Sequence, residues 1–118
     1  MTTKGEQAMR LREIVVAAAA AVLSLGVAHA AVDTAAAEAL MKKSGCMKCH
    51  SVTAKKDGPS FKSTAEKLKG KPDAEAELYK HLTTHPTIKI DGKEEKHESL
   101  KTTNDAEIKN VIQYILSR

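Results

Sequence analysis

Two cysteines and one histidine form a cluster whose spacing suits covalent cofactor chemistry. Cys46 and Cys49 are the only cysteines of the chain, and His50 directly follows the second of them. This C-x-x-C-H pattern is the attachment site of a c-type haem. Each thiol adds across one vinyl group of the porphyrin, and the two-residue gap matches the separation of the vinyls. His50 then lies under the iron as an axial ligand, so the pentapeptide predicts one covalent haem c and its iron.

Three other interpretations of the same residues remain open. A thioredoxin-like redox pair requires a βαβ setting, and the downstream sequence has no clear strand pattern. A zinc site requires four ligands, which only the scattered His81, His85 and His97 could complete. A disulfide between the two cysteines would close too small a loop to constrain the unfolded chain much. The cysteine count, the pentapeptide and the expected export all favour haem.

The first thirty residues have the composition of a secretory signal peptide. A basic start at residues 4–12 precedes an apolar run at 14–25 and the triplet Ala28-His29-Ala30. A charged region, an apolar region and an A-x-A end predict cleavage after Ala30 and export to the periplasm. The alternative is a retained membrane anchor, but the run is shorter than the ~20 residues that span a bilayer. The expected functional domain is therefore residues 31–118, and it is not expected to span a membrane.

The pattern of that domain predicts an all-α fold of about four short helices. The helices are expected at residues 35–44, between Pro59 and Gly70, from Pro72 to just before Pro86, and after Asn104. Asp33 or Thr34 can cap the first helix, and Asn104 with Glu107 is a variant of the capping box. The polar segment 86–103 is expected as a connection with a turn at Asp91-Gly92. A domain this small usually needs a disulfide, a metal or a cofactor in its core.

Basic residues are concentrated in one part of the sequence. The chain has 19 basic and 15 acidic side chains and a net charge of +4. Nine lysines face two acidic residues between Lys42 and Lys71, whereas residues 72–118 carry seven basic and nine acidic groups. Such a positive face steers docking onto acidic partner proteins, or simply keeps the protein soluble. Nucleic acid is not expected as a partner, because aromatic residues do not interleave with the lysines.

The sequence resembles the class I monohaem cytochromes c, in particular the small bacterial c551/c552-like group, over residues 31–118. The matching stretches are Cys46-Met-Lys-Cys-His50, Gly58-Pro59-Ser60-Phe61, Lys67-Leu-Lys-Gly70 and Tyr114-Ile-Leu-Ser117. The resemblance implies that the first and last helices cross, with Tyr114 at their contact. It also implies that Pro59 and Phe61 belong to the haem site, the Pro59 carbonyl accepting a hydrogen bond from His50.

The sixth iron ligand is where the sequence departs from this family. Those cytochromes supply a methionine from the loop before the last helix, but the methionines here are at positions 1, 9, 41 and 47 only. With Tyr114 at the family's aromatic position, the methionine position falls seventeen residues earlier, on His97. We therefore expect His97 as the distal ligand. His85 is the second choice, His81 is expected at the surface of its helix, and an open or water-ligated iron is the remaining alternative.

These features lead to two competing functions. The first is a soluble periplasmic electron carrier, expected as a monomer, that exchanges single electrons with redox partner proteins through acidic docking surfaces. Bis-histidine carriers of this shape resemble the periplasmic cytochromes of extracellular (Mto-type) metal-oxidation chains. Those cytochromes pass electrons between outer-membrane and inner-membrane components. The resemblance implies multihaem or membrane cytochromes as partners. The second is a sensor or enzyme that binds a gas or a peroxide at an open iron. Two histidine ligands favour the carrier.

Overall fold

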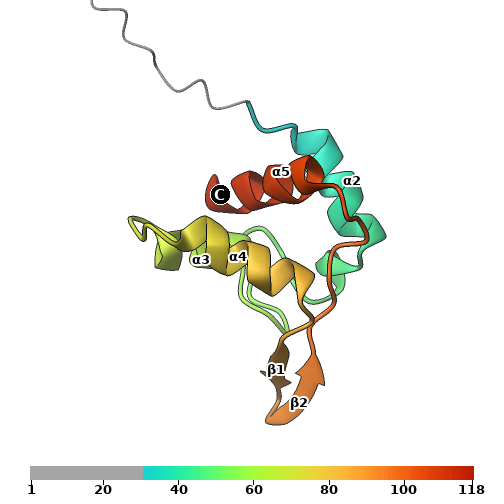
Figure 1. Cartoon of the computed structure of the whole chain (residues 1–118). Coiled ribbons are helices and arrows are strands. Elements are labelled where there is room, and N and C mark those ends of the chain that lie inside the picture. Colours follow the sequence, from blue (N-terminus) through green and yellow to red (C-terminus); the bar gives the residue numbers. More distant parts are fainter. Residues whose placement is uncertain (1–30) are drawn as a thin grey trace, which may run out of the picture.

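The computed structural model describes residues 31–118, which form four α-helices, one short 3-10 helix and a two-stranded hairpin (Figure 1). In chain order they are α2 (Thr34–Lys43), η1 (Cys46–Lys48), α3 (Phe61–Leu68), α4 (Ala74–Thr83), β1 (Thr87–Ile90), β2 (Lys93–Lys96) and α5 (Asp105–Leu116). All four predicted helices are confirmed. The predicted signal peptide and its cleavage site lie outside the described residues.

Side-chain caps determine where three of the helices begin. Asp33, one of the two predicted caps, accepts a hydrogen bond from the backbone N–H of Ala36 at 3.0 Å. Ser60 does the same for Ser63 at 3.1 Å, and Asn104 for Glu107 at 3.2 Å. The reciprocal bond of a capping box is missing at α5, because the Glu107 carboxylate accepts from the Thr102 hydroxyl instead. Each cap satisfies a backbone donor that helix geometry leaves free.

Helix α5 packs against α2, α3 and α4 and carries the centre of the core. Its apolar residues Ile108, Val111, Ile112 and Ile115 are all buried, as their 3.6-residue periodicity predicts. Helices α2 and α5 run across each other, as predicted (Figure 1). Buried Tyr114 lies at this contact and donates a hydrogen bond from its hydroxyl to Glu38 at 3.1 Å.

The segment after α4 differs from the sequence-based expectation, which foresaw no strands there. Strands β1 and β2 pair antiparallel, with Thr87 opposite Lys96 and Ile90 opposite Lys93. The predicted turn joins them, and Asp91 and Gly92 both have positive φ angles, 50° and 77°. Two consecutive positive φ angles are typical of the type I′ turn that Asp-Gly favours in hairpins. The expectation failed because each strand has only four residues and β2 is charged and exposed.

None of the helices in residues 31–118 is long and apolar enough to cross a bilayer.

Candidate haem site

A cavity of about 440 Å³ opens between the Cys46–His50 segment, the following loop, α3, α4, β1 and α5. Its volume lies within the ~300–1,000 Å³ common for cofactor sites. Apolar side chains from five elements line it, among them Met41, Leu68, Leu82, Ile88 and Val111. Cys46, Cys49, His50, Pro59, Phe61 and His97 also line it. The structure thus brings together every site residue that the sequence predicted, apart from the second-choice ligand His85.

The two cysteines reach the cavity from η1 and the residue after it. Gly45 precedes η1 with a φ angle of 77°, which lets the chain turn sharply out of α2. The His50 backbone N–H then donates to the Cys46 carbonyl at 3.0 Å, which closes the motif into one compact turn. Both cysteines carry free thiols, and burial raises the pKa of Cys46. The motif therefore presents two thiols and one imidazole to the same cavity.

The His50 ring is held on two sides. Its Nδ1–H donates to the Pro59 carbonyl at 2.7 Å. Its face stacks on Phe61, with ring centroids 5.4 Å apart and an angle of 23° between the planes. Since Nδ1 carries the proton, Nε2 keeps a free lone pair and can bind a metal ion.

Gly58 has no side chain, and the His50 ring occupies the space that a side chain at position 58 would fill. A Cβ atom at position 58 would lie 2.8 Å from Nδ1 and 3.0 Å from Nε2 of His50, and closer still to Cε1. The Gly58 backbone N–H donates to the Cys49 carbonyl at 2.8 Å, so the loop cannot move away easily. A side chain here would have to displace the imidazole.

His97 lies on the same cavity and faces His50 across it. The two ring centroids are 6.1 Å apart, with 56° between the ring planes. Nδ1 of His97 is buried and is without a hydrogen-bond partner among residues 31–118. Burial first, and then the neighbouring His81 and His50, lower the pKa of His97 to about 4, against a smaller opposite effect of Glu98. His97 is therefore a neutral imidazole with an unpartnered ring nitrogen.

The arrangement fits a covalent haem. Two thiols line one part of the cavity, one imidazole is oriented by Pro59, and a second imidazole lines the same cavity with its ring centroid 6.1 Å from that of the first. The chain matches the family described as cytochrome c over residues 34–118. It belongs to the cytochrome c family. With one attachment motif in its sequence it is a monohaem, class I member of a family of electron carriers; its cofactor is haem c, and Cys46 and Cys49 fit the haem-binding motif.

Solved structures with the same fold include the class 1 cytochrome MtoD from Sideroxydans lithotrophicus ES-1. It is 46% identical, with a TM-score of 0.71, over 74% of this chain and 97% of that chain. Cytochrome c552 of Nitrosomonas europaea is 28% identical, with a TM-score of 0.53, over 68% of this chain and 96% of that chain. The predicted all-α cytochrome c fold is therefore confirmed.

Two curated relatives match shorter stretches. Cytochrome c-551 of Pseudomonas aeruginosa is 42% identical over 45 residues, which are 38% of this chain and 43% of that protein. Cytochrome c-552 of Hydrogenobacter thermophilus is 49% identical over 41 residues, which are 35% of this chain and 42% of that protein. The matches thus span about two fifths of the length of these relatives and agree with the predicted c551/c552-like group.

The other two histidines of residues 31–118 lie in different places from those expected. His85 is exposed and outside the cavity, where its Nδ1–H donates to the His97 carbonyl at 3.2 Å. His81, expected at the helix surface, is half-buried and lines the cavity. Its ring centroid is 4.2 Å from that of His97. Sequence reasoning missed this contact, because nothing in the spacing of residues 81 and 97 shows that α4 and the end of β2 meet.

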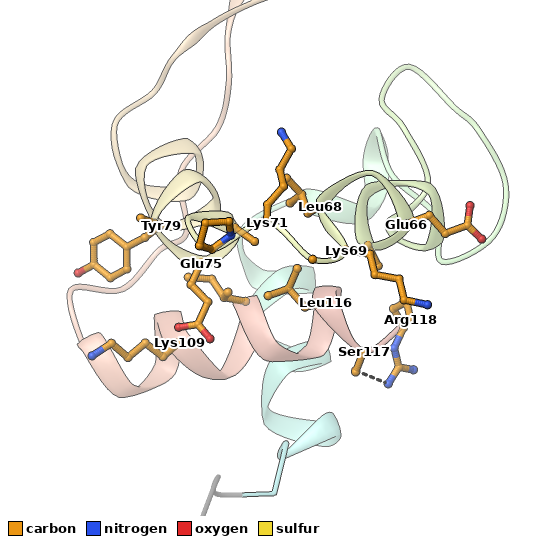
Figure 2. A pocket seen from close by; sticks show the side chains of 16 residues that line it. Glu66, Leu68, Lys69, Lys71, Glu75, Tyr79, Lys109, Leu116, Ser117 and Arg118 are labelled. Carbon is orange, nitrogen blue, oxygen red and sulfur yellow. Dashed lines mark hydrogen bonds between the residues drawn. The ribbon is translucent and has the colours of Figure 1, made fainter. Parts of the chain in front are cut away.

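The cytochrome has a second, larger hollow on another part of its surface, of about 970 Å³ (Figure 2). It lies where the α3–α4 turn meets α5, and Lys69, Lys71, Lys109 and Arg118 stand along it together with Glu66 and Glu75. Cysteines and histidines are not among the residues that line it. The chemistry that the sequence predicts is therefore confined to the smaller cavity.

The contact between Gly58 and His50 predicts a large effect of one methyl group. Gly58→Ala should tilt the imidazole away from the Pro59 carbonyl and weaken its bond to the iron, at a cost of about 1–3 kcal/mol in folding free energy. The reduced variant should show a weakened proximal ligand by resonance Raman spectroscopy and a lower thermal midpoint. Gly70→Ala is the control without a steric clash, since a Cβ there has open space, although the φ of 78° at Gly70, unlike that of Gly58, lies in the left-handed region. Equal spectra for native protein and Gly58→Ala would contradict the steric argument.

Proposed function

We propose that this cytochrome is a periplasmic electron carrier whose iron is bound by His50 and His97. The observation that carries the proposal is the 6.1 Å between the centroids of these two rings, across the cavity that also holds both cysteines. When bound, the haem supplies an iron that gains and loses one electron. The protein's part is to attach the haem, to supply both ligands and to exclude other molecules from the iron.

The separation of the rings suits one metal ion between them. A first-row metal binds an imidazole nitrogen at about 2 Å, and two such bonds extended to the ring centres add up to about 6 Å. His97 is also neutral at physiological pH, because its pKa of about 4 leaves a lone pair available. Both properties support His97 as the second ligand of the iron.

The main chain brings His97 to this position. Its backbone N–H donates to the Pro86 carbonyl at 2.8 Å, directly after the last residue of β2. Three residues later, the Leu100 backbone N–H donates to the Leu82 carbonyl at 3.0 Å, which joins this stretch to the end of α4. The hairpin thus replaces the methionine loop of the c551/c552-like group as the element that presents the distal ligand. An iron bound on both faces favours electron transfer over the binding of a gas or a peroxide.

The native protein tests the proposal directly. Ferric electron paramagnetic resonance combined with near-infrared magnetic circular dichroism distinguishes two imidazoles from imidazole with methionine or water. We expect a low-spin ferric haem with the charge-transfer band of two imidazoles. A band typical of histidine with methionine, or a high-spin spectrum, would refute His97 as the ligand.

The basic segment provides a docking surface for the redox partner. All nine lysines between Lys42 and Lys71 are exposed. Lys67 lines the haem cavity, and exposed Met47 lies next to Lys48 beside the attached cysteines. An apolar side chain among lysines close to the cofactor suits docking onto an acidic protein, because charge steers the encounter and apolar contact stabilises it. We propose that this acidic partner is a multihaem or membrane cytochrome. It would belong to a periplasmic chain that carries electrons between the outer and inner membranes.

Charge reversal tests this surface. Lys48→Glu with Lys55→Glu should lower the association rate with an acidic partner by about tenfold at low salt, and should flatten the dependence of the rate on ionic strength. Stopped-flow electron transfer measures both. Lys80→Glu with Lys109→Glu is the matched control, since it changes net charge equally outside the segment. Equal rates for the two double variants would mean that only net charge matters and that this surface does not dock.

A further inference from the structure

The two proposed ligands are held in different ways. His50 is oriented by a hydrogen bond from its own ring nitrogen to the Pro59 carbonyl. His97 is held by its main chain, through the Pro86 carbonyl and the His85 imidazole, while its buried Nδ1 has no partner among residues 31–118. A metal-binding histidine usually donates its second ring N–H to a neighbour, which fixes the angle of the ring. The angle of the His97 ring needs another explanation.

The His81 ring is in contact with the His97 ring. The centroids are 4.2 Å apart with 52° between the planes, a closer approach than that of His50 to either Phe61 or His97. His81 stands on α4, between the exposed Lys80 and the buried Leu82. Because Leu78 and Leu82 anchor α4 in the core and α4 packs against α5, the His81 ring has a rigid support.

We propose that His81 is a positioning residue that sets the angle of the His97 ring on the iron, by packing against it in place of a hydrogen bond. The proposal rests on the proposed function, in which His97 binds the iron. Rotation of an imidazole about its last side-chain bond has only a broad, shallow preference of its own. A flat neighbour on a rigid helix restricts that rotation through close contact. The main chain thus decides where His97 lies, and His81 decides how its ring is turned.

This role has two measurable consequences. The g values of a low-spin ferric haem depend on the angle between the planes of two imidazoles that bind its iron, and the planes of the His50 and His97 rings make an angle of 56°. A ring that can rotate also leaves the iron more often, so an external ligand binds faster. Loss of the His81 ring should therefore change the g values and speed up ligand exchange, without removing either imidazole from the iron at equilibrium.

The test compares His81→Ala with His81→Phe and with Lys80→Ala, an exposed neighbour on the same helix. In His81→Ala we expect shifted or broadened g values and about tenfold faster binding of external imidazole. A change of about tenfold is typical when a residue that orients a metal ligand is removed. His81→Phe keeps a flat ring and should restore both toward the native values. Lys80→Ala should match the native protein. Far-UV circular dichroism and thermal midpoints check that all three variants are folded.

The outcomes separate this proposal from the proposed function. If the spectra of the native protein lack the signature of two imidazole ligands, the proposed function is refuted. Native spectra with two imidazoles, but g values and binding rates that are unchanged in His81→Ala, refute only the positioning role. A His81→Phe variant that is folded and no better than His81→Ala also refutes it, since packing by a flat ring is then not what matters. A high-spin His81→Ala protein would make His81 itself the ligand and overturn both.

Discussion

Replacing His97 by alanine should convert the ferric haem from low spin to high spin. The variant loses the distal ligand that we propose, and neither methionine of residues 31–118 lies in the hairpin or in the segment after it, because buried Met41 belongs to α2 and exposed Met47 lies beside the cysteines. The change should appear in the visible spectrum and in electron paramagnetic resonance. External imidazole should then bind and restore the low-spin spectrum.

The size of the effect follows from competition for one coordination position. If His97 is bound to the iron about 99% of the time, only about 1% of the iron sites are open to an external ligand. The apparent affinity of that ligand is then about a hundredfold lower than for a site that is always open. His97→Ala should remove that factor. His97→Met should raise the reduction potential, provided that the hairpin still closes, because a methionine ligand raises the potential of a c-type haem relative to histidine.

His85→Ala is the matched control. It removes a histidine twelve residues away that donates to the His97 carbonyl but lies outside the cavity. The variant should stay low spin, with a lower thermal midpoint, since one intramolecular hydrogen bond contributes about 0.5–1.5 kcal/mol. A His97→Ala protein that stays low spin while His85→Ala becomes high spin would transfer the ligand role to His85.

Removing both attachment cysteines should leave the chain unable to fold. Core residues of α2, α3, α4 and α5 line the cavity of about 440 Å³. At ~24 cal/mol per Å³, leaving such a volume empty costs of the order of 10 kcal/mol. The whole folding free energy of a small domain is about 5–15 kcal/mol. Cys46→Ala with Cys49→Ala should therefore show little helix by far-UV circular dichroism.

Two further measurements complete this experiment. The exported native protein should have the mass of residues 31–118 plus one haem, which also tests cleavage after Ala30. Cys46→Ala alone keeps Cys49 and His50, so it should fold with haem attached at one point and a lower thermal midpoint. A folded, haem-free monomer with a disulfide between Cys46 and Cys49 would contradict the expected dependence of folding on haem.

Local sequence determined the chemistry of this protein and the outline of its fold. The C-x-x-C-H motif lies within five residues, so its spacing alone specifies the attached cofactor. The helices were predictable because the 3.6-residue period of their buried side chains and the caps at Asp33 and Asn104 are local signals. The Asp91-Gly92 turn was equally visible. The hairpin around it was missed although Ile88 and Ile90 alternate with polar residues, which is the pattern that flanks such a turn.

Tertiary structure decided which side chains meet in the cavity. Gly58 and His50 are eight residues apart, and only the fold of the loop shows that the imidazole fills the space of a missing side chain. Of the three histidines after the motif, the sequence singled out His97 by its distance from Tyr114, ranked His85 second and placed His81 at the surface of its helix. Packing of α4 on α5 and the pairing of β1 with β2 place His97 opposite His50, turn His85 outward and bring His81 against His97. These contacts depend on where whole elements come to lie, which is set by long-range packing and not by the spacing of residues along the chain.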